Sequence, residues 1–129
     1  MTGRVLLDTS VVVDYLRQDF DLHQKIDQVS DVYLPLTVLG ELLYGAYKST
    51  QKAKMLAQVR EFSNGCVVIL PDETTADIYG RIKTELSAAG KPIPENDIWI
   101  AAAAKEHGLP LATRDQHFSF VSGLTIFKW

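Results

Sequence analysis

The feature that most constrains the fold is a short apolar run, Val5-Leu6-Leu7, which ends in Asp8 and is followed by Thr9 and Ser10. A strand that is apolar at every position is buried on both faces, which is typical of a parallel sheet covered by helices. In open sheets of this kind, ligands bind beyond the carboxyl ends of the strands. The run therefore predicts a buried strand over residues 4–8 that places Asp8 at such a position.

Further apolar runs alternate with helical patterns along the chain. Strands are expected at residues 32–34, 66–70, 111–112 and 124–127, and helices at residues 11–17, 22–29, 37–48, 51–62, 71–89 and 95–107. Strands and helices that alternate in this way form a parallel sheet joined by right-handed crossovers. The sequence predicts a three-layer α/β/α fold in one domain over residues 1–129, with a central, mainly parallel sheet of four or five short strands.

Some local features of the helices can also be predicted. Thr9 or Ser10 is expected to cap the first helix, and Thr37 the third, because their hydroxyls accept hydrogen bonds from free backbone N–H groups. Gly40 and Gly45 weaken the third helix, which indicates close packing against another backbone.

Composition and charge restrict the class of protein. No segment approaches ~18 apolar residues and no signal peptide is recognisable, so a cytoplasmic protein without membrane contact is expected. The one cysteine, Cys66, excludes an intramolecular disulfide, and its apolar neighbours favour a buried strand residue. The chain has 13 basic and 16 acidic residues, which gives a net charge of −3. If four of the acidic residues share one site, the rest of the chain carries 13 basic and 12 acidic groups and is not acidic overall. A nucleic-acid partner is therefore not excluded.

Three further acidic residues interrupt apolar patterns. Glu41 lies within an apolar stretch of helix, Asp97 at the start of a helix, and Asp115 just after a strand. Each has an ordinary explanation when taken singly. Glu41 could lie on a solvated helix face, Asp97 could interact with the helix dipole, and Asp115 could form a turn. However, Asp8 and Asp115 each follow a parallel strand, and the helices of Glu41 and Asp97 begin near the same edge. The four carboxylates are therefore expected to meet there.

Four ionised carboxylates in one cleft repel one another and need a compensating charge. A hard divalent cation supplies this charge, and Mg²⁺ or Mn²⁺ suits all-oxygen ligands. Zn²⁺ is not expected, because no histidine or cysteine is predicted to accompany the acids. His117 and the other two histidines have no predicted partner.

Four polar side chains are candidates for supporting roles: Thr9, Ser10, Asn96 and Thr113. The three hydroxyls could bind a phosphate or a water, or could serve only as helix caps and turn bonds. Asn96 could support the site or be only an N-cap. Arg114 could face a phosphate or could simply be exposed.

Four segments resemble the landmarks of PIN-domain nucleases: Leu6-Leu7-Asp8-Thr9-Ser10-Val11, Glu41-Leu42-Leu43-Tyr44-Gly45, Asn96-Asp97-Ile98-Trp99-Ile100-Ala101-Ala102 and Leu111-Ala112-Thr113-Arg114-Asp115-Gln116-His117-Phe118. The resemblance is strongest to the VapC-type toxins of bacterial and archaeal toxin–antitoxin (VapBC) pairs. It implies an Mg²⁺- or Mn²⁺-dependent endoribonuclease whose catalytic, metal-binding cluster is Asp8, Glu41, Asp97 and Asp115. It also implies a homodimer inhibited by a VapB-type antitoxin, whose tail covers the active site.

We expect Asp8 and Asp97 to bind the main metal ion directly, with Glu41 and Asp115 completing the site or ordering its waters. RNA affinity is expected from scattered basic residues, although such residues usually form only a solvated surface. The candidates are Lys48, Lys52, Lys54, Arg81, Lys83 and Lys91.

Two alternatives remain open at this point. A haloacid-dehalogenase-type phosphatase also has an aspartate at the end of its first strand, as covalent nucleophile. That family needs a second aspartate two residues later, where this chain has Ser10. A non-catalytic PIN-like module that only binds a protein partner would not need the acidic cluster.

Overall fold

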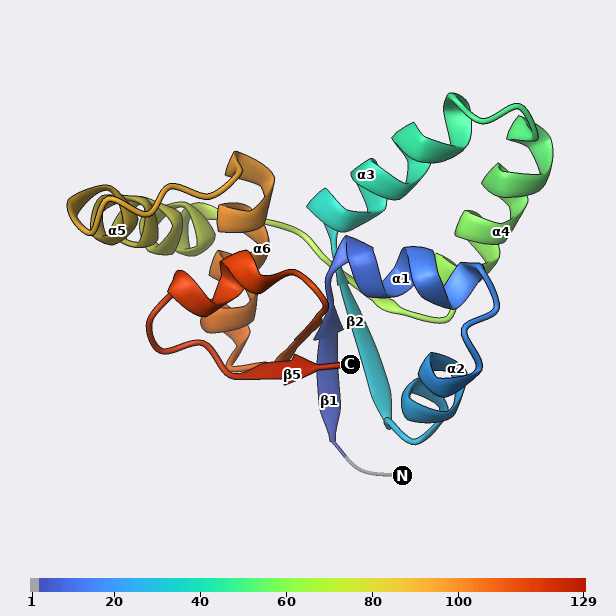
Figure 1. The fold of residues 1–129 in the computed structure, drawn as a ribbon, viewed down its shortest axis with the longest axis horizontal. Helices are drawn as coiled ribbons and strands as arrows, with labels where there is room; N and C mark the ends of the chain where they lie inside the picture. The colour runs from blue at the N-terminus through green and yellow to red at the C-terminus, as the bar shows by residue number, and fades with distance from the viewer. Residues whose placement is uncertain (1–2) are drawn as a thin grey trace.

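A parallel sheet forms the centre of the fold. The computed structural model describes residues 3–129, in which five strands form one sheet in the order β3-β2-β1-β4-β5 (Figure 1). Every neighbouring pair of strands is parallel. The strands are β1 (Arg4–Leu7), β2 (Asp31–Pro35), β3 (Val67–Ile69), β4 (Leu111–Thr113) and β5 (Ile126–Lys128). The predicted α/β fold with a parallel sheet is confirmed.

Helices connect the strands in the order expected from the sequence. They are α1 (Thr9–Leu16), α2 (Phe20–Asp27), α3 (Leu36–Tyr47), α4 (Lys52–Asn64), α5 (Glu73–Ala88), α6 (Glu95–His107) and the 3-10 helix η1 (Gln116–Phe120). Asp72 and Thr75 form a capping box at the start of α5. Gly108 ends α6 in the left-handed conformation, which glycine adopts without a steric penalty. Within residues 3–129, no helix is long and apolar enough to cross a membrane.

The direction of the connections across the sheet identifies its ligand-binding edge. The chain moves from β1 to β3 through α1–α4, and then returns past β1 to β4 and β5. Because parallel crossovers are right-handed, this reversal places the two sets of helices on opposite faces. Figure 1 shows α1–α4 on one side of the sheet and α5 and α6 on the other. The reversal occurs between β1 and β4, which is where open α/β sheets bind ligands.

The core buries residues from the elements that carry this edge. Leu6 and Leu7 of β1 are fully buried, as expected for a strand covered on both faces. Helix α6 is buried at residues 98 and 100–104, four of which are alanines whose small side chains permit close packing. Phe118 of η1 is also fully buried and fixes the segment that follows β4.

Several local predictions were wrong at the helix starts. Asp8 itself is the N-cap of α1, so the helix begins at Thr9, and neither Thr9 nor Ser10 serves as the cap. Helix α3 begins at Leu36 without a side-chain cap, so Thr37 does not cap it. The 3-10 helix η1 was not predicted, and the last strand begins after it, at residue 126.

Two predictions about small residues were also wrong. A Cβ atom added at Gly40 or Gly45 would meet nothing within 4 Å, so neither glycine marks a close backbone contact. Cys66 lies just before β3 and is only half-buried, with its thiol donating to the Phe62 carbonyl oxygen at 3.3 Å. Burial raises the pKa of the Cys66 thiol to about 11, so the thiol is unreactive at neutral pH.

Candidate active site

Asp8 is a buried carboxylate at the reversal point of the sheet, where β1 ends, and it is only 4% exposed. Its Oδ1 accepts a hydrogen bond from the Thr9 backbone N–H at 2.7 Å. Its Oδ2 accepts bonds from the Ser10 hydroxyl at 2.9 Å and the Thr113 hydroxyl at 2.7 Å. Burial raises the pKa of Asp8, these hydrogen bonds oppose the rise, and the charge of Asp115 adds a smaller increase.

Glu41 reaches the same edge from α3. The Thr9 hydroxyl donates to Glu41 Oε1 at 2.7 Å, while the Thr9 backbone N–H bonds Asp8. Thr9 therefore links two carboxylates from separate elements, and its side chain positions Glu41 instead of capping a helix.

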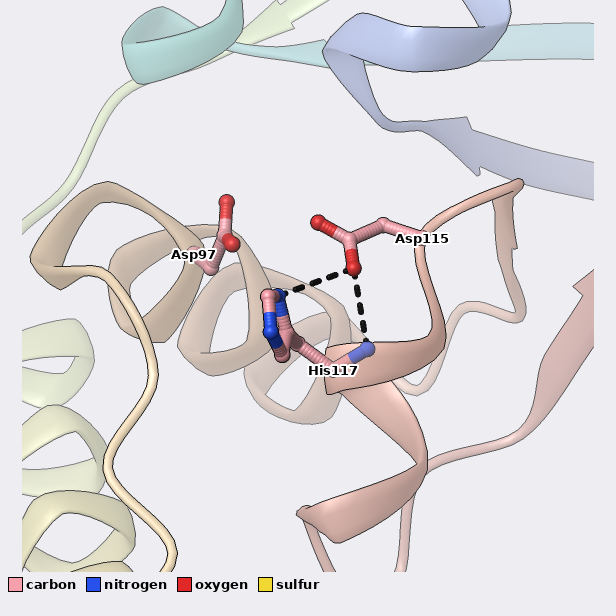
Figure 2. Close-up of side chains that lie close together, drawn as sticks. All are labelled: Asp97, Asp115 and His117. Carbon is pink, nitrogen blue, oxygen red and sulfur yellow. Dashed lines mark hydrogen bonds and ion pairs between the residues drawn. The ribbon is translucent and has the colours of Figure 1, made fainter.

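Asp115 follows β4 and is held by both neighbouring segments. Its backbone N–H donates to the Thr113 hydroxyl at 2.9 Å, and that hydroxyl in turn donates to Asp8. Its Oδ1 accepts the His117 backbone N–H at 2.9 Å and lies 3.0 Å from His117 Nδ1. In Figure 2 the other carboxylate oxygen of Asp115 points toward Asp97.

Asp97 lies in the first turn of α6 and faces Asp115 and His117 (Figure 2). Its pKa is raised from 3.8 to about 6, first by burial and then by the negative charges of Asp8, Asp115 and Glu41, whereas His117 lowers it. Asp97 therefore lies within electrostatic reach of the other three carboxylates.

The arrangement has the donor chemistry of a cation site. Asp97, Asp115 and His117 each offer one ligand atom, and these atoms all lie within 4.8 Å of one another. Mutual repulsion and burial both oppose ionisation of Asp97 and Asp8, and a bound cation would relieve that opposition. The residues therefore fit a divalent metal ion.

His117 is the site residue that the sequence interpretation missed. The expectation that no histidine accompanies the acids was wrong, because His117 contacts Asp115 directly. Its position two residues after an aspartate in a turn was the available signal, since Asx-type turns bring such residues together.

The remaining candidates differ in their placement. Asn96 is exposed inside α6, and the N-cap position belongs to Pro94, so Asn96 is not the cap. Arg114 neither faces the cluster nor lies free: its guanidinium bonds Asp14 at 2.8 Å and Asp19 at 3.0 Å. This double ion pair ties the turn after β4 to the end of α1.

Comparison with known proteins gives consistent matches over nearly the whole chain. A model of the PIN domain matches residues 5–124. The chain is 31% identical to ribonuclease VapC2 of Haemophilus influenzae over 98% of both chains. It is also 31% identical to the tRNA(fMet)-specific endonuclease VapC of Shigella flexneri over 98% of both. The solved structure of DNA-bound VapBC from Salmonella typhimurium aligns with a TM-score of 0.92 at 28% identity, covering 100% of this chain and 99% of that one.

Proposed function

Since the chain belongs to the PIN-domain family and to the VapC ribonucleases within it, we propose that it is a toxin that hydrolyses RNA phosphodiester bonds. The observation that supports this function is the group of Asp97, Asp115 and His117, whose ligand atoms lie within 4.8 Å of one another. The charges of Asp8 and Glu41 also reach Asp97. We infer that it acts on RNA in the cytoplasm, where a VapB-type antitoxin would inhibit it. The solved VapBC complex that resembles this chain supports that partner, and the family resemblance supports a homodimer.

Asp97 and Asp115, with His117 and Asp8, are the groups that would hold the cation, which we assign as Mg²⁺ or Mn²⁺. When bound, the ion supplies charge neutralisation at the phosphate and a water of lowered pKa as nucleophile. The carboxylates favour these hard cations, and His117 adds a ligand that Mn²⁺ accepts more readily than Mg²⁺.

The hydrogen bonds of Asp8 and Asp115 leave one carboxylate oxygen of each residue with a free lone pair for a cation. Asp8 Oδ2 accepts two hydroxyl donors, whereas Oδ1 accepts only the Thr9 N–H and retains a lone pair. Asp115 Oδ1 accepts from His117, which leaves Oδ2 available toward Asp97. Ser10 and Thr113 therefore orient Asp8, and His117 orients Asp115, as supporting residues do in metal sites.

RNA affinity at one side of the site is supported by a groove that contains Glu41. Lys48 and Lys54 line this groove, whose volume is about 540 Å³. In contrast, Arg81 is ion-paired with Asp77, and Lys83 with Glu95. Lys48 and Lys54 are therefore the stronger candidates for phosphate contacts among the predicted basic residues.

The phosphatase alternative is disfavoured by the surroundings of Asp8. That family needs a second aspartate two residues after the nucleophile, but the residue there is Ser10, whose hydroxyl donates to Asp8 Oδ2 at 2.9 Å. The solvent-facing groups of the cluster are Asp97, Asp115 and His117.

The proposal is tested by incubating purified protein with total cellular RNA in EDTA, and then with added Mg²⁺ or Mn²⁺. We expect cleavage only with the metal ion, and a loss of at least about 100-fold in Asp8→Asn and Asp97→Asn, because ligand removal eliminates the metal-dependent rate. Asp77→Asn is the matched control, since Asp77 pairs with Arg81 on α5.

Calorimetric titration of Mn²⁺ into the same variants separates the possible failures. Full cleavage by a folded Asp8→Asn variant would refute the assignment of the site. No Mn²⁺ binding by the wild type, together with no cleavage, would favour the non-catalytic binding module.

A further inference from the structure

A second pocket opens beside Asp115, on the side of the site away from Glu41. Its volume is about 390 Å³, and it lies between the turn after β4, η1 and β5. Its lining includes Thr113, Asp115, Gln116, Ile126, Lys128 and Trp129. The size is within the range of ligand pockets, about 300–1,000 Å³.

The register of the sheet connects this pocket to the acidic cluster. Lys128 of β5 pairs with Thr113 of β4, so their backbones are one strand separation apart, about 4.8 Å. Thr113 in turn bonds Asp8. The pocket and the carboxylates therefore share Thr113 and Asp115 as a common wall.

The lining combines three kinds of group that suit a nucleotide. The half-buried Trp129 offers an indole face, and Ile126 adds an apolar wall. Lys128 is exposed and forms no ion pair with any residue in the described range 3–129. The exposed Gln116 presents an amide, which can donate to or accept from a base edge.

The strand order places basic grooves on both sides of Asp8. The Glu41 groove, with Lys48 and Lys54, lies on the side of β2 and α3, whereas Lys128 lies on the side of β4 and β5. An RNA strand whose scissile phosphate lies at the carboxylates must extend in both directions from them. The β5 pocket lies on the second side of the carboxylates and contains both Lys128 and the apolar side chains of Ile126 and Trp129.

We propose that this pocket is a nucleotide subsite, in which a base adjacent to the scissile phosphate stacks on Trp129 while Lys128 contacts its phosphate. The proposal rests on the RNA-cleaving function stated above and adds where the substrate is held. A neutral base suits the hollow better than a free anion does, because Asp115 forms part of the wall. Stacking on an aromatic ring with a nearby cation is a general mode of single-strand binding.

Fluorescence of Trp129 provides a direct measurement. The chain has two tryptophans, so Trp99→Phe leaves Trp129 as the sole indole, and Asp8→Asn prevents cleavage during titration. Single-stranded hexamers of adenylate, uridylate or cytidylate should quench this fluorescence in a saturable manner. Kd is measured independently from the anisotropy of fluorescein-labelled hexamers.

Substitutions then separate stacking from charge. Trp129→Ala should raise Kd by about 5- to 150-fold, and Trp129→Phe by less, because a ring is retained. Lys128→Ala should lower the slope of log K against log salt by about one. Phe20→Ala and Lys25→Ala, an exposed aromatic residue and an ion-paired lysine on α2, are the matched controls and should change Kd less than twofold.

The possible results distinguish this subsite from the function on which it rests. If the wild type cleaves and binds RNA but Trp129→Ala and Lys128→Ala behave as the controls do, the subsite is refuted and the nuclease function stands. If the wild type neither binds nor cleaves RNA, the function itself fails. Should Trp129→Ala not fold, Trp129→Phe and Lys128→Ala still decide the question.

Discussion

The charge of Asp97 should destabilise the metal-free protein, so Asp97→Asn should stabilise it while abolishing cation binding. The pKa of this carboxyl group is about 6, compared with 3.8 when it is unperturbed, because of burial and the charges of Asp8, Asp115 and Glu41. The folded protein therefore holds a proton that the unfolded chain has already released between these two pH values.

The sign of the pH dependence follows from this difference in bound protons. Stability from Asp97 is fully present below about pH 3.8, falls as the pH rises, and is lost above about pH 6. The full shift corresponds to about 3 kcal/mol. Because Asp97 is only half-buried, solvent screening reduces this to about 1–1.5 kcal/mol. For a domain of this size, that is a rise in Tm of about 3–6 °C for Asp97→Asn at pH 7.5.

Urea and thermal unfolding in EDTA, at several pH values from 4 to 7.5, provide the measurement. The stability difference between Asp97→Asn and the wild type should be near zero at pH 4 and grow as the pH rises. Adding Mn²⁺ at pH 7.5 should stabilise the wild type and leave Asp97→Asn unchanged, since only binding to the native state shifts unfolding.

Asp77 provides the control for the effect of pH on the stability of Asp97→Asn. Asp77→Asn, which removes an exposed aspartate paired with Arg81, should show no comparable increase with pH. A destabilising effect of the Asp97 charge is refuted if Asp97→Asn is less stable than the wild type at pH 7.5 in EDTA. A stability difference that stays constant from pH 4 to 7.5 would also refute it.

Three further perturbations test the packing around the site. Thr113→Val should lower the free energy of unfolding in urea by about 1–3 kcal/mol, because Asp8 loses a donor and the Asp115 N–H loses its acceptor; Thr113→Ser should restore most of it. Gly40→Ala should raise the unfolding free energy by up to about 1 kcal/mol, since the added methyl group meets nothing within 4 Å, and a decrease would show a constraint on this glycine. Phe118→Ala should lower it by about 3–5 kcal/mol, because this fully buried ring leaves a cavity; a loss below 1 kcal/mol would mean that the core collapses around it.

The proximity of Asp8 and Asp115 was predictable from the sequence because it depends on the direction in which their strands run. The apolar run before Asp8 indicates a doubly covered strand, and parallel strands end at one edge, so Asp8 and Asp115 had to lie near each other. The position of Asp97 alone does not predict a ligand, since an acid in the first turn of a helix is common without one.

The roles of the hydroxyls and of His117 could not be predicted, because they depend on contacts between distant segments. Thr113 bonds Asp8 across 105 positions of sequence. Thr9 bonds Glu41 across 32 positions. Local rules favour caps and turns for such residues. Thr113 does accept the turn bond from the Asp115 N–H, but its bond to Asp8 and the bond of Thr9 to Glu41 are tertiary contacts that no local rule predicts. The double ion pair of Arg114 with Asp14 and Asp19 is likewise non-local.

The central place of β1 has a consequence for the growing chain. One neighbour of β1, β2, follows it closely in the chain, whereas the other, β4, begins only at Leu111. A nascent or broken chain that stops before Leu111 lacks Thr113 and Asp115, and exposes one edge of β1. The acidic cluster is therefore one of the last parts of the fold that the growing chain can complete, because two of its residues follow a strand near the end of the sequence.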